Sequence, residues 1–442
     1  WSGNLEVGGM KILVVFHFKK DGKSWTATMD SPNQGATGIP VDELSFEDKK
    51  LELKINAAGI SYAGEWIDNQ HIEGTASQRG MSMELKLEKS GEGADVANVR
   101  PQEPQRPFPY VEKEIVFTNK MANIKLHGTL TKPSNEGKFP AVILISGSGP
   151  QDRNSEILGH KPFLVLAHEL TIKGFAVLRF DERGVGKSEG NFSEATSLDF
   201  ASDVNSAFRF LYKRKDIISH QIGLFGHSEG GLIAPMVAKG NKKVGFIILA
   251  AAPGISGDKL MLMQQEAIGK KGGTDAKTLL AQRELTEKAF AIVKNGTDAS
   301  KIKTDLSSYF DKELKSKKYK KLYDGSSKGA LKSIYMQQLG SNWMQLFVKL
   351  DPANFLSQVS CPVLALGGSL DLQVPMDENL AAIEKALKAG NASYKIEKIN
   401  GLNHLFQEAS TGLPTEYGVI EQTFSPKAIE VIGDWIKKTT KK

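Results

Sequence analysis

The sequence predicts two domains, a small all-β domain followed by an α/β domain whose mostly parallel sheet is covered by helices. From residue 1 to about 89, short runs of β-forming residues follow one another without helical periodicity. Beyond residue 110, continuous runs of Val, Ile and Leu alternate with amphipathic helical segments, which is typical of a parallel sheet buried on both faces. At 442 residues the chain is also longer than one hydrophobic core usually accommodates.

The first domain, predicted at residues 1–95, is expected to hold about six to eight short strands. Its strand-like segments read KILVVFHF, SWTATMD, KLELKI, GISYAGEW and MSMELKLEK. Short strands without intervening helices predict a small antiparallel barrel or sandwich. The stretch at 90–110 is rich in Pro, Gly and polar residues, so we place an interdomain linker at 96–110.

The second domain, predicted at 111–442, begins with a hairpin and continues as alternating strands and helices. Between Gly254 and about Lys349 the strand pattern stops and helical segments take over, which predicts a helical cap at 255–349 inserted between two core strands. The predicted core strands read FPAVILIS, FAVLRFD, IGLFG, VGFIILAA, CPVLALGG and SYKIEKING.

Composition excludes several classes of protein. Hydrophobic residues make up 40% and charged residues 24% of the chain, and no apolar run approaches the length of about 20 residues that spans a bilayer. The net charge of +6 is small for this length, and the lysine-rich stretch 312–321 is typical of a solvated helix face, so we expect no nucleic-acid partner. Cys361 is the single cysteine, which leaves no disulfide within the chain.

The segment FGHSEGG at 225–231 carries the strongest chemical pattern. It follows the apolar run 222–225 and precedes a predicted helix, which is the context of a Gly-x-Ser-x-Gly nucleophile elbow. Gly226 and Gly230 leave room for the strained turn that would expose Ser228 above the sheet. The pattern predicts Ser228 as a nucleophile, with the backbone N–H of Glu229 as one oxyanion donor.

A serine nucleophile needs a base that is itself oriented by an acid. Of eight histidines, His404 lies in the loop after the last predicted strand and can reach Ser228 from the same edge of the sheet. Asp371 is the first carboxylate after the preceding strand and is favoured as the acid, with Asp377 near a helix start as the alternative. We therefore predict Ser228, Asp371 and His404 as catalytic.

The second oxyanion donor is expected from the glycine-rich turn SGSGP at 146–150. We assign it to the N–H of Ser148, with Gly149 as the fallback. The segment FDERGVGKSEG at 180–190 has the closing Gly-Lys-Ser of a phosphate loop, but Asp181 stands where that motif requires its first glycine, so a nucleotide site is not expected.

Together, GHSEGG, SGSGPQDRN, DERGVGKS, GGSLDLQVP and GLNHLF resemble the α/β-hydrolase superfamily over about 111–442, with nucleophile, acid and histidine in the order of that family. Within it, the chain looks like bacterial carboxylesterases and the related acyl-peptide and dienelactone hydrolases. The resemblance implies Ser228 as nucleophile, Asp371 as acid and His404 as base. The chain departs from the family at Ser146-Gly147, where His-Gly is common.

From this resemblance we expect a serine hydrolase of carboxylic esters, acting on short acyl groups or on acylated small molecules or sugars. A serine peptidase or acyl-peptide hydrolase and a non-catalytic ligand- or glycan-binding protein are the alternatives. We expect no metal and no organic cofactor, and the oligomeric state stays open. An appended β-domain is similar to those of exported hydrolases, and because the sequence starts at Trp1 we expect a signal peptide to be missing and an extracytoplasmic location. The expected substrate pocket consists of Gly149, His227, Trp343, Met344 and Phe347.

Overall fold

A computed structural model describes the chain except residues 8–9, 23, 32–35, 57–58, 79–80, 90–99, 324–326, 391 and 442. It divides into two compact units. One consists of Trp1–Pro101 together with Ile157–His160 and Pro414–Glu421, and the other holds the remaining residues. The predicted boundary at residue 95 lies outside the described residues, and the division at Pro101 falls inside the predicted linker.

Among the residues that the structure describes, the smaller unit is an antiparallel sheet of nine strands, against the six to eight expected. Four of them lie outside the segments named from the sequence: Ser2–Val7, Ala36–Pro40, Glu43–Glu47 and His71–Gln78. Alternation explains the core: in the strand at Lys50–Ile55 every second residue, Leu51, Leu53 and Ile55, is buried, while the residues between them face solvent. The strands are β1 (Ser2–Val7), β2 (Met10–Asp21), β3 (Ser24–Ser31), β4 (Ala36–Pro40), β5 (Glu43–Glu47), β6 (Lys50–Ile55), β7 (Ile60–Trp66), β8 (His71–Gln78) and β9 (Met81–Glu88), in the order β4-β3-β2-β1-β9-β8-β7-β6-β5.

The larger unit is built on an eight-stranded mixed sheet, in the order β10-β11-β13-β12-β14-β15-β16-β17. The hairpin β10–β11 pairs antiparallel with β13, and every pairing from β13 to β17 is parallel. Its strands are β10 (Val111–Asn119), β11 (Ile124–Lys132), β12 (Phe139–Ile145), β13 (Ala176–Phe180), β14 (Ile217–His227), β15 (Phe246–Ala250), β16 (Val363–Gly368) and β17 (Tyr394–Ile399).

Helices cover both faces of this sheet, which is why β13, β15 and β16 consist entirely of buried residues. The helices are α1 (Pro162–Ile172), α2 (Ser197–Tyr212), α3 (Glu229–Gly240), α9 (Ala353–Leu356), α10 (Met376–Ala389) and α11 (Pro426–Thr440). Alternate residues of β12 belong to two different cores: Ile143 packs with α2, α3 and α10, whereas Leu144 packs with α1 and α11. The predicted fold class is confirmed.

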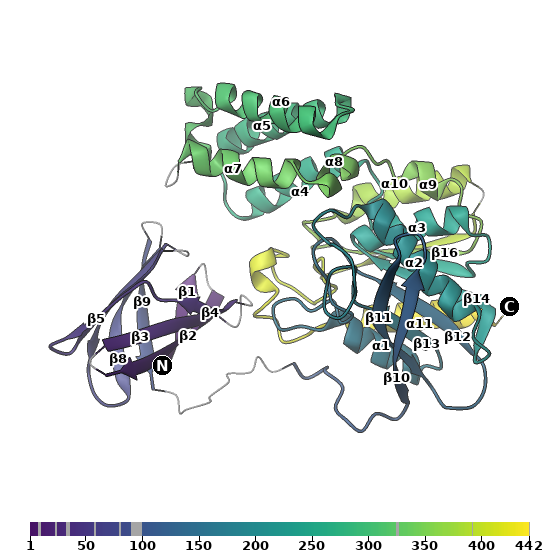
Figure 1. Cartoon of the computed structure of the whole chain (residues 1–442), viewed down its shortest axis with the longest axis horizontal. Coiled ribbons are helices and arrows are strands. Elements are labelled where there is room, and N and C mark those ends of the chain that lie inside the picture. The colour runs from purple at the N-terminus through teal and green to yellow at the C-terminus, as the bar shows by residue number, and fades with distance from the viewer. Residues whose placement is uncertain are drawn as a thin grey trace. The chain divides into compact units, whose positions relative to one another are not determined.

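Between β15 and β16, helices form a layer of their own (Figure 1). Phe310, Leu285 and Val348 are completely buried in the hydrophobic core of this cap, which also takes in Leu232 of α3 and Val374 of the loop after β16. Its elements are α4 (Gly257–Lys271), α5 (Ala276–Asn295), α6 (Ala299–Glu313), η3 (Lys317–Tyr323), α7 (Lys328–Leu339) and α8 (Asn342–Phe347). These helices pack their apolar faces mainly against one another, so the cap is a distinct layer. Only some of its residues contact the sheet domain.

Candidate active site

Ser228 stands at the turn between β14 and α3 with a backbone that non-glycine residues rarely adopt, at φ 53° and ψ −120°. Both flanking glycines are required by close backbone approach. A Cβ on Gly226 would lie 2.0 Å from the Gly230 carbonyl oxygen, and one on Gly230 would lie 2.2 Å from that of Ile145. The Ser228 N–H donates to the Ala250 carbonyl at 2.9 Å, which fixes the turn against the next strand. The local geometry is that of a nucleophile elbow.

Asp371 and His404, which follow β16 and β17, are in direct contact. His404 Nδ1 lies 2.9 Å from Asp371 Oδ2, and both side chains are buried. The other carboxylate oxygen accepts the backbone N–H groups of Gln373 and Val374, each at 2.8 Å. With Nδ1 donating its proton to Asp371, the Nε2 of His404 is left as an acceptor. Asp377, the alternative acid, instead pairs with Lys398 in solvent.

His227 joins the elbow to the histidine loop. Its Nε2 donates to the His404 carbonyl oxygen at 2.8 Å, and the two rings are 4.9 Å apart. Desolvation lowers the pKa of His227 to about 4, so the ring is neutral near pH 7. The residue next to Ser228 is thus hydrogen-bonded to the predicted base. The structure shows a supporting contact of His227 with the histidine loop, and its predicted place in the substrate pocket stays a prediction.

The turn after β12 lies against the elbow. A Cβ on Gly147 would be 3.1 Å from Ser228 Cβ, which is tighter than an ordinary contact, so a side chain here would press on the elbow. Ser148 is exposed, and Gly149 has a φ of 98° that favours glycine. Glu229 is the first residue of α3, where backbone N–H groups have no partner within the helix. The N–H groups of Glu229 and of Ser148 or Gly149 therefore remain the candidate oxyanion donors.

Glu182 supports this turn and was not among the predicted site residues. Its carboxyl group accepts the Ser146 hydroxyl at 2.6 Å and the Gln151 backbone N–H at 3.1 Å. Burial, with a smaller contribution from the nearby carboxyl of Glu229, raises the pKa of Glu182 to about 8 against the opposing effect of its two hydrogen bonds. This residue belongs to the DERGVGKS segment, which carries part of the family resemblance and does not fit a phosphate loop, but neither pattern assigns a role to Glu182. A carboxyl group directly after a buried strand was the overlooked pattern.

The three aromatic and apolar residues expected in the pocket lie in α8 of the cap. Met344 and Phe347 are buried in the cap core, and the Phe347 ring stacks on Trp343 with ring centroids 4.9 Å apart. The indole N–H of Trp343 donates a hydrogen bond to a residue outside the cap, Glu229, whose Oε1 lies 2.7 Å away. The structure thus brings Trp343 to the elbow and leaves an acyl-pocket role for these residues as a prediction.

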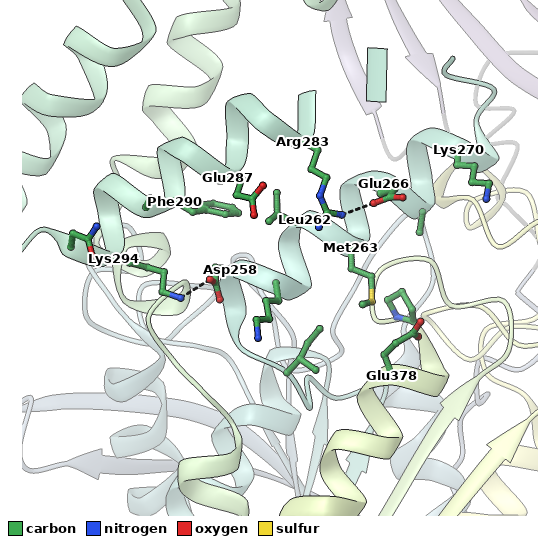
Figure 2. Close-up of a pocket in the computed structure, with 16 residues that line it drawn as sticks. Asp258, Leu262, Met263, Glu266, Lys270, Arg283, Glu287, Phe290, Lys294 and Glu378 are labelled. Atoms are coloured by element: carbon green, nitrogen blue, oxygen red, sulfur yellow. Dashed lines mark hydrogen bonds and ion pairs between the residues drawn. The ribbon is translucent and has the colours of Figure 1, made fainter. Parts of the chain in front are cut away.

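A pocket of about 930 Å³ lies in the cap between α4 and α5 (Figure 2). Its apolar wall includes Leu262, Met263 and Phe290, and its charged rim contains the ion pairs Lys294–Asp258 and Arg283–Glu266. None of Ser228, Asp371 and His404 lines it. This pocket is therefore not formed by the three predicted catalytic residues.

Two kinds of feature are absent from the part of the chain that the structure describes, a metal-binding cluster and a membrane-spanning helix. No group of three or more His, Cys, Asp or Glu side chains among them is arranged to hold a metal ion. No helix in the same part of the chain is both long and apolar enough to cross a bilayer.

Comparison with known proteins gives partial matches. The model of the family described as serine aminopeptidase, S33, matches residues 161–328. Esterase EstD of Thermotoga maritima is 31% identical over 144 residues, which is 33% of this chain and 33% of that protein. The chain therefore spans about a third of that relative's length.

Two further proteins are similar over longer stretches. An uncharacterized 31.7 kDa protein from the traX-finO intergenic region of Escherichia coli is 24% identical over 323 residues, covering 70% of this chain and 94% of that protein. Esterase Pf2001 of Pyrococcus furiosus has 18% identity and a TM-score of 0.44, covering 74% of this chain and 90% of that one.

The sheet order and the elbow give the larger unit an α/β-hydrolase fold, and part of that unit, residues 161–328, matches the family model. Over about a third of its length, the sequence is similar to that of an esterase.

Proposed function

We propose that the protein is a serine hydrolase that cleaves carboxylic esters through an acyl-enzyme on Ser228. The observation that carries this proposal is the buried 2.9 Å contact between His404 Nδ1 and Asp371. This contact leaves His404 Nε2 as an acceptor that can act as a base. His227, the residue directly before Ser228, donates a hydrogen bond to the His404 backbone carbonyl. The similarity to an esterase supports an ester as the substrate.

In the proposed reaction, Ser228 Oγ bonds to the ester carbonyl carbon while its proton moves to His404 Nε2. The carbonyl oxygen becomes an oxyanion, which the N–H groups of Glu229 and of Ser148 or Gly149 would stabilise. Collapse breaks the bond to the alcohol oxygen, which takes the proton from His404 and leaves as the alcohol. Water, deprotonated by His404, then attacks the acyl-enzyme, releases the carboxylic acid and restores Ser228. Asp371 holds the His404 ring and stabilises its charged form.

A serine peptidase is the second candidate, because the matching family is described as serine aminopeptidase. The same three residue types cleave amides, and the fold does not decide between them. The esters to be expected carry short acyl groups, on small molecules or sugars.

The test compares p-nitrophenyl esters of increasing acyl length with aminoacyl p-nitroanilides. We expect turnover of short esters that Ser228→Ala removes, with an unchanged melting temperature. Ser300→Ala is the matched control, since Ser300 is exposed on α6 of the cap and far along the chain from the site. Hydrolysis of the anilides alone would establish the peptidase instead. No serine-dependent turnover of either series would refute the hydrolase proposal and favour a binding protein.

We also propose an extracytoplasmic location, on the resemblance of the appended β-domain to those of exported hydrolases. Fractionation of cells that express the full-length natural protein tests this. Recovery in the cytoplasmic fraction would contradict it.

A further inference from the structure

The side chain of Glu229 is buried directly behind the nucleophile elbow, with 4% of its surface exposed. Its Oε1 accepts two hydrogen bonds, one from the Ser197 hydroxyl at 2.6 Å and one from the Trp343 indole N–H at 2.7 Å. Ser197 is the first residue of α2, and Trp343 belongs to α8 of the cap. One oxygen atom therefore joins the start of α3 to the start of α2 and to the cap.

Burial of this carboxyl group is unfavourable unless specific partners compensate for lost water. An acidic residue in the first turn of a helix is stabilised by the helix dipole, but an exposed position would supply that benefit without the cost of desolvation. Desolvation raises the pKa of Glu229, and the two hydrogen bonds oppose that rise. The residue is thus held by two neutral donors that come from two other elements.

Trp343 is fixed from the cap side. Its ring stacks on Phe347 with an interplanar angle of 18°, and Phe347 is 4% exposed within the cap core. The neighbouring residue Asn342 donates to the Glu194 carboxylate at 2.7 Å, on the segment that leads into α2. The cap therefore presents the indole N–H to Glu229 from a position with little freedom.

We propose that Trp343 is a positioning residue for the reaction, acting through Glu229 on the oxyanion donor. This inference rests on the proposed function. The Glu229 side chain and its backbone N–H share one Cα, so a side chain clamped from two sides restricts the direction in which that N–H points. Separation of α8 from the sheet domain would break the Trp343 bond and release one side of the clamp. The cap thereby influences the rate of the chemical step as well as access to the site.

Trp343→Phe tests this, because phenylalanine keeps an aromatic ring next to Phe347 and loses the N–H donor together with part of the indole ring; the control below makes the same loss of ring size. The matched control is Trp435→Phe, whose ring packs against Phe246 on the other face of the sheet. Kinetics are measured with p-nitrophenyl acetate and p-nitrophenyl octanoate. We expect Trp343→Phe to lower kcat about 10-fold on both esters, the effect of losing one buried hydrogen bond, with KM for the acetate unchanged. Trp435→Phe should leave both constants unchanged.

Coupling is tested by a double-mutant cycle. In the background of Glu229→Ala, Trp343→Phe should cost nothing further, since both changes remove the same bond. A rise in KM confined to the octanoate would overturn the proposal and make Trp343 a wall of the acyl pocket. Additive losses in the cycle would also overturn it.

A measurement without substrate separates this inference from the proposed function. The Trp343 indole N–H should exchange slowly with solvent deuterium, and Glu229→Ala should accelerate that exchange while the Trp435 indole N–H is unaffected. Fast exchange in the unmodified protein would refute the clamp. Absence of any ester turnover, with slow exchange retained, would refute the proposed function alone.

Discussion

Glu182→Gln is expected to make the protein more stable at alkaline pH. The carboxyl group of Glu182 is 8% exposed, accepts from Ser146 and Gln151, and has no cationic partner among its hydrogen bonds. Glutamine reproduces the protonated carboxyl group at this position, because its amide can donate to the Ser146 hydroxyl oxygen while its carbonyl accepts the Gln151 N–H. The substitution therefore removes an ionisation and keeps both contacts.

The sign and size of the effect follow from the pKa. Burial raises the pKa of Glu182 from 4.5 to about 8 in the folded protein. Between these two values the folded state keeps a proton that the unfolded state releases, so the associated stability is fully present below pH 4.5 and is lost as pH rises to about 8. At about 1.4 kcal/mol for each unit of pKa, the loss is about 5 kcal/mol.

Calorimetric melting of the two proteins at pH 5, 7 and 9 measures this loss. Glu182→Gln should melt close to the unmodified protein at pH 5 and several degrees above it at pH 9. Glu136→Gln is the matched control, since Glu136 is exposed and its substitution should shift no melting temperature at any pH. If the unmodified protein and Glu182→Gln lost stability in parallel between pH 5 and pH 9, Glu182 would not carry the proton and the reasoning would be wrong.

Two further substitutions test the site geometry. In Asp371→Asn the amide oxygen should accept the two backbone N–H groups, so the side-chain NH2 would face His404 Nδ1 and force the imidazole proton onto Nε2. We expect kcat to fall about 10³- to 10⁴-fold. An active variant would exclude Asp371 as the orienting acid. In Gly147→Ala the added Cβ would lie 3.1 Å from Ser228 Cβ and displace the nucleophile. We expect kcat to fall up to about 100-fold with the circular dichroism spectrum unchanged. Full activity would contradict a close approach of the turn after β12 to Ser228.

The sequence allowed the candidate triad to be predicted because its members stand at strand ends. In a parallel sheet the carboxyl ends of the strands meet at one edge, so loops far apart in sequence share a site. The apolar runs that end at Phe225, Gly367 and Ile399 marked those loops without any knowledge of side-chain contacts. The observed contact between Asp371 and His404 follows from this placement.

Contacts between elements could not be predicted in the same way. The hydrogen bond from Trp343 to Glu229 joins residues 114 positions apart, and the one from Ser146 to Glu182 joins residues 36 apart. Apolar periodicity fixes which face of a helix is buried, but it does not state which polar side chain the buried face meets. The strand β5 shows the same limit in the smaller unit, since its residues are mostly exposed and show no alternation.

The two buried carboxyl groups near the elbow have a common electrostatic consequence. An ionised carboxylate beside the proposed oxyanion would oppose the negative charge that develops there. Burial raises the pKa of both Glu182 and Glu229, and the charge of Glu229 raises that of Glu182 further, so ionisation of both at once is disfavoured. A protonated carboxyl group still accepts a hydrogen bond through its carbonyl oxygen. Both residues can therefore hold the two oxyanion segments in place while carrying less negative charge than exposed glutamates would at the same pH.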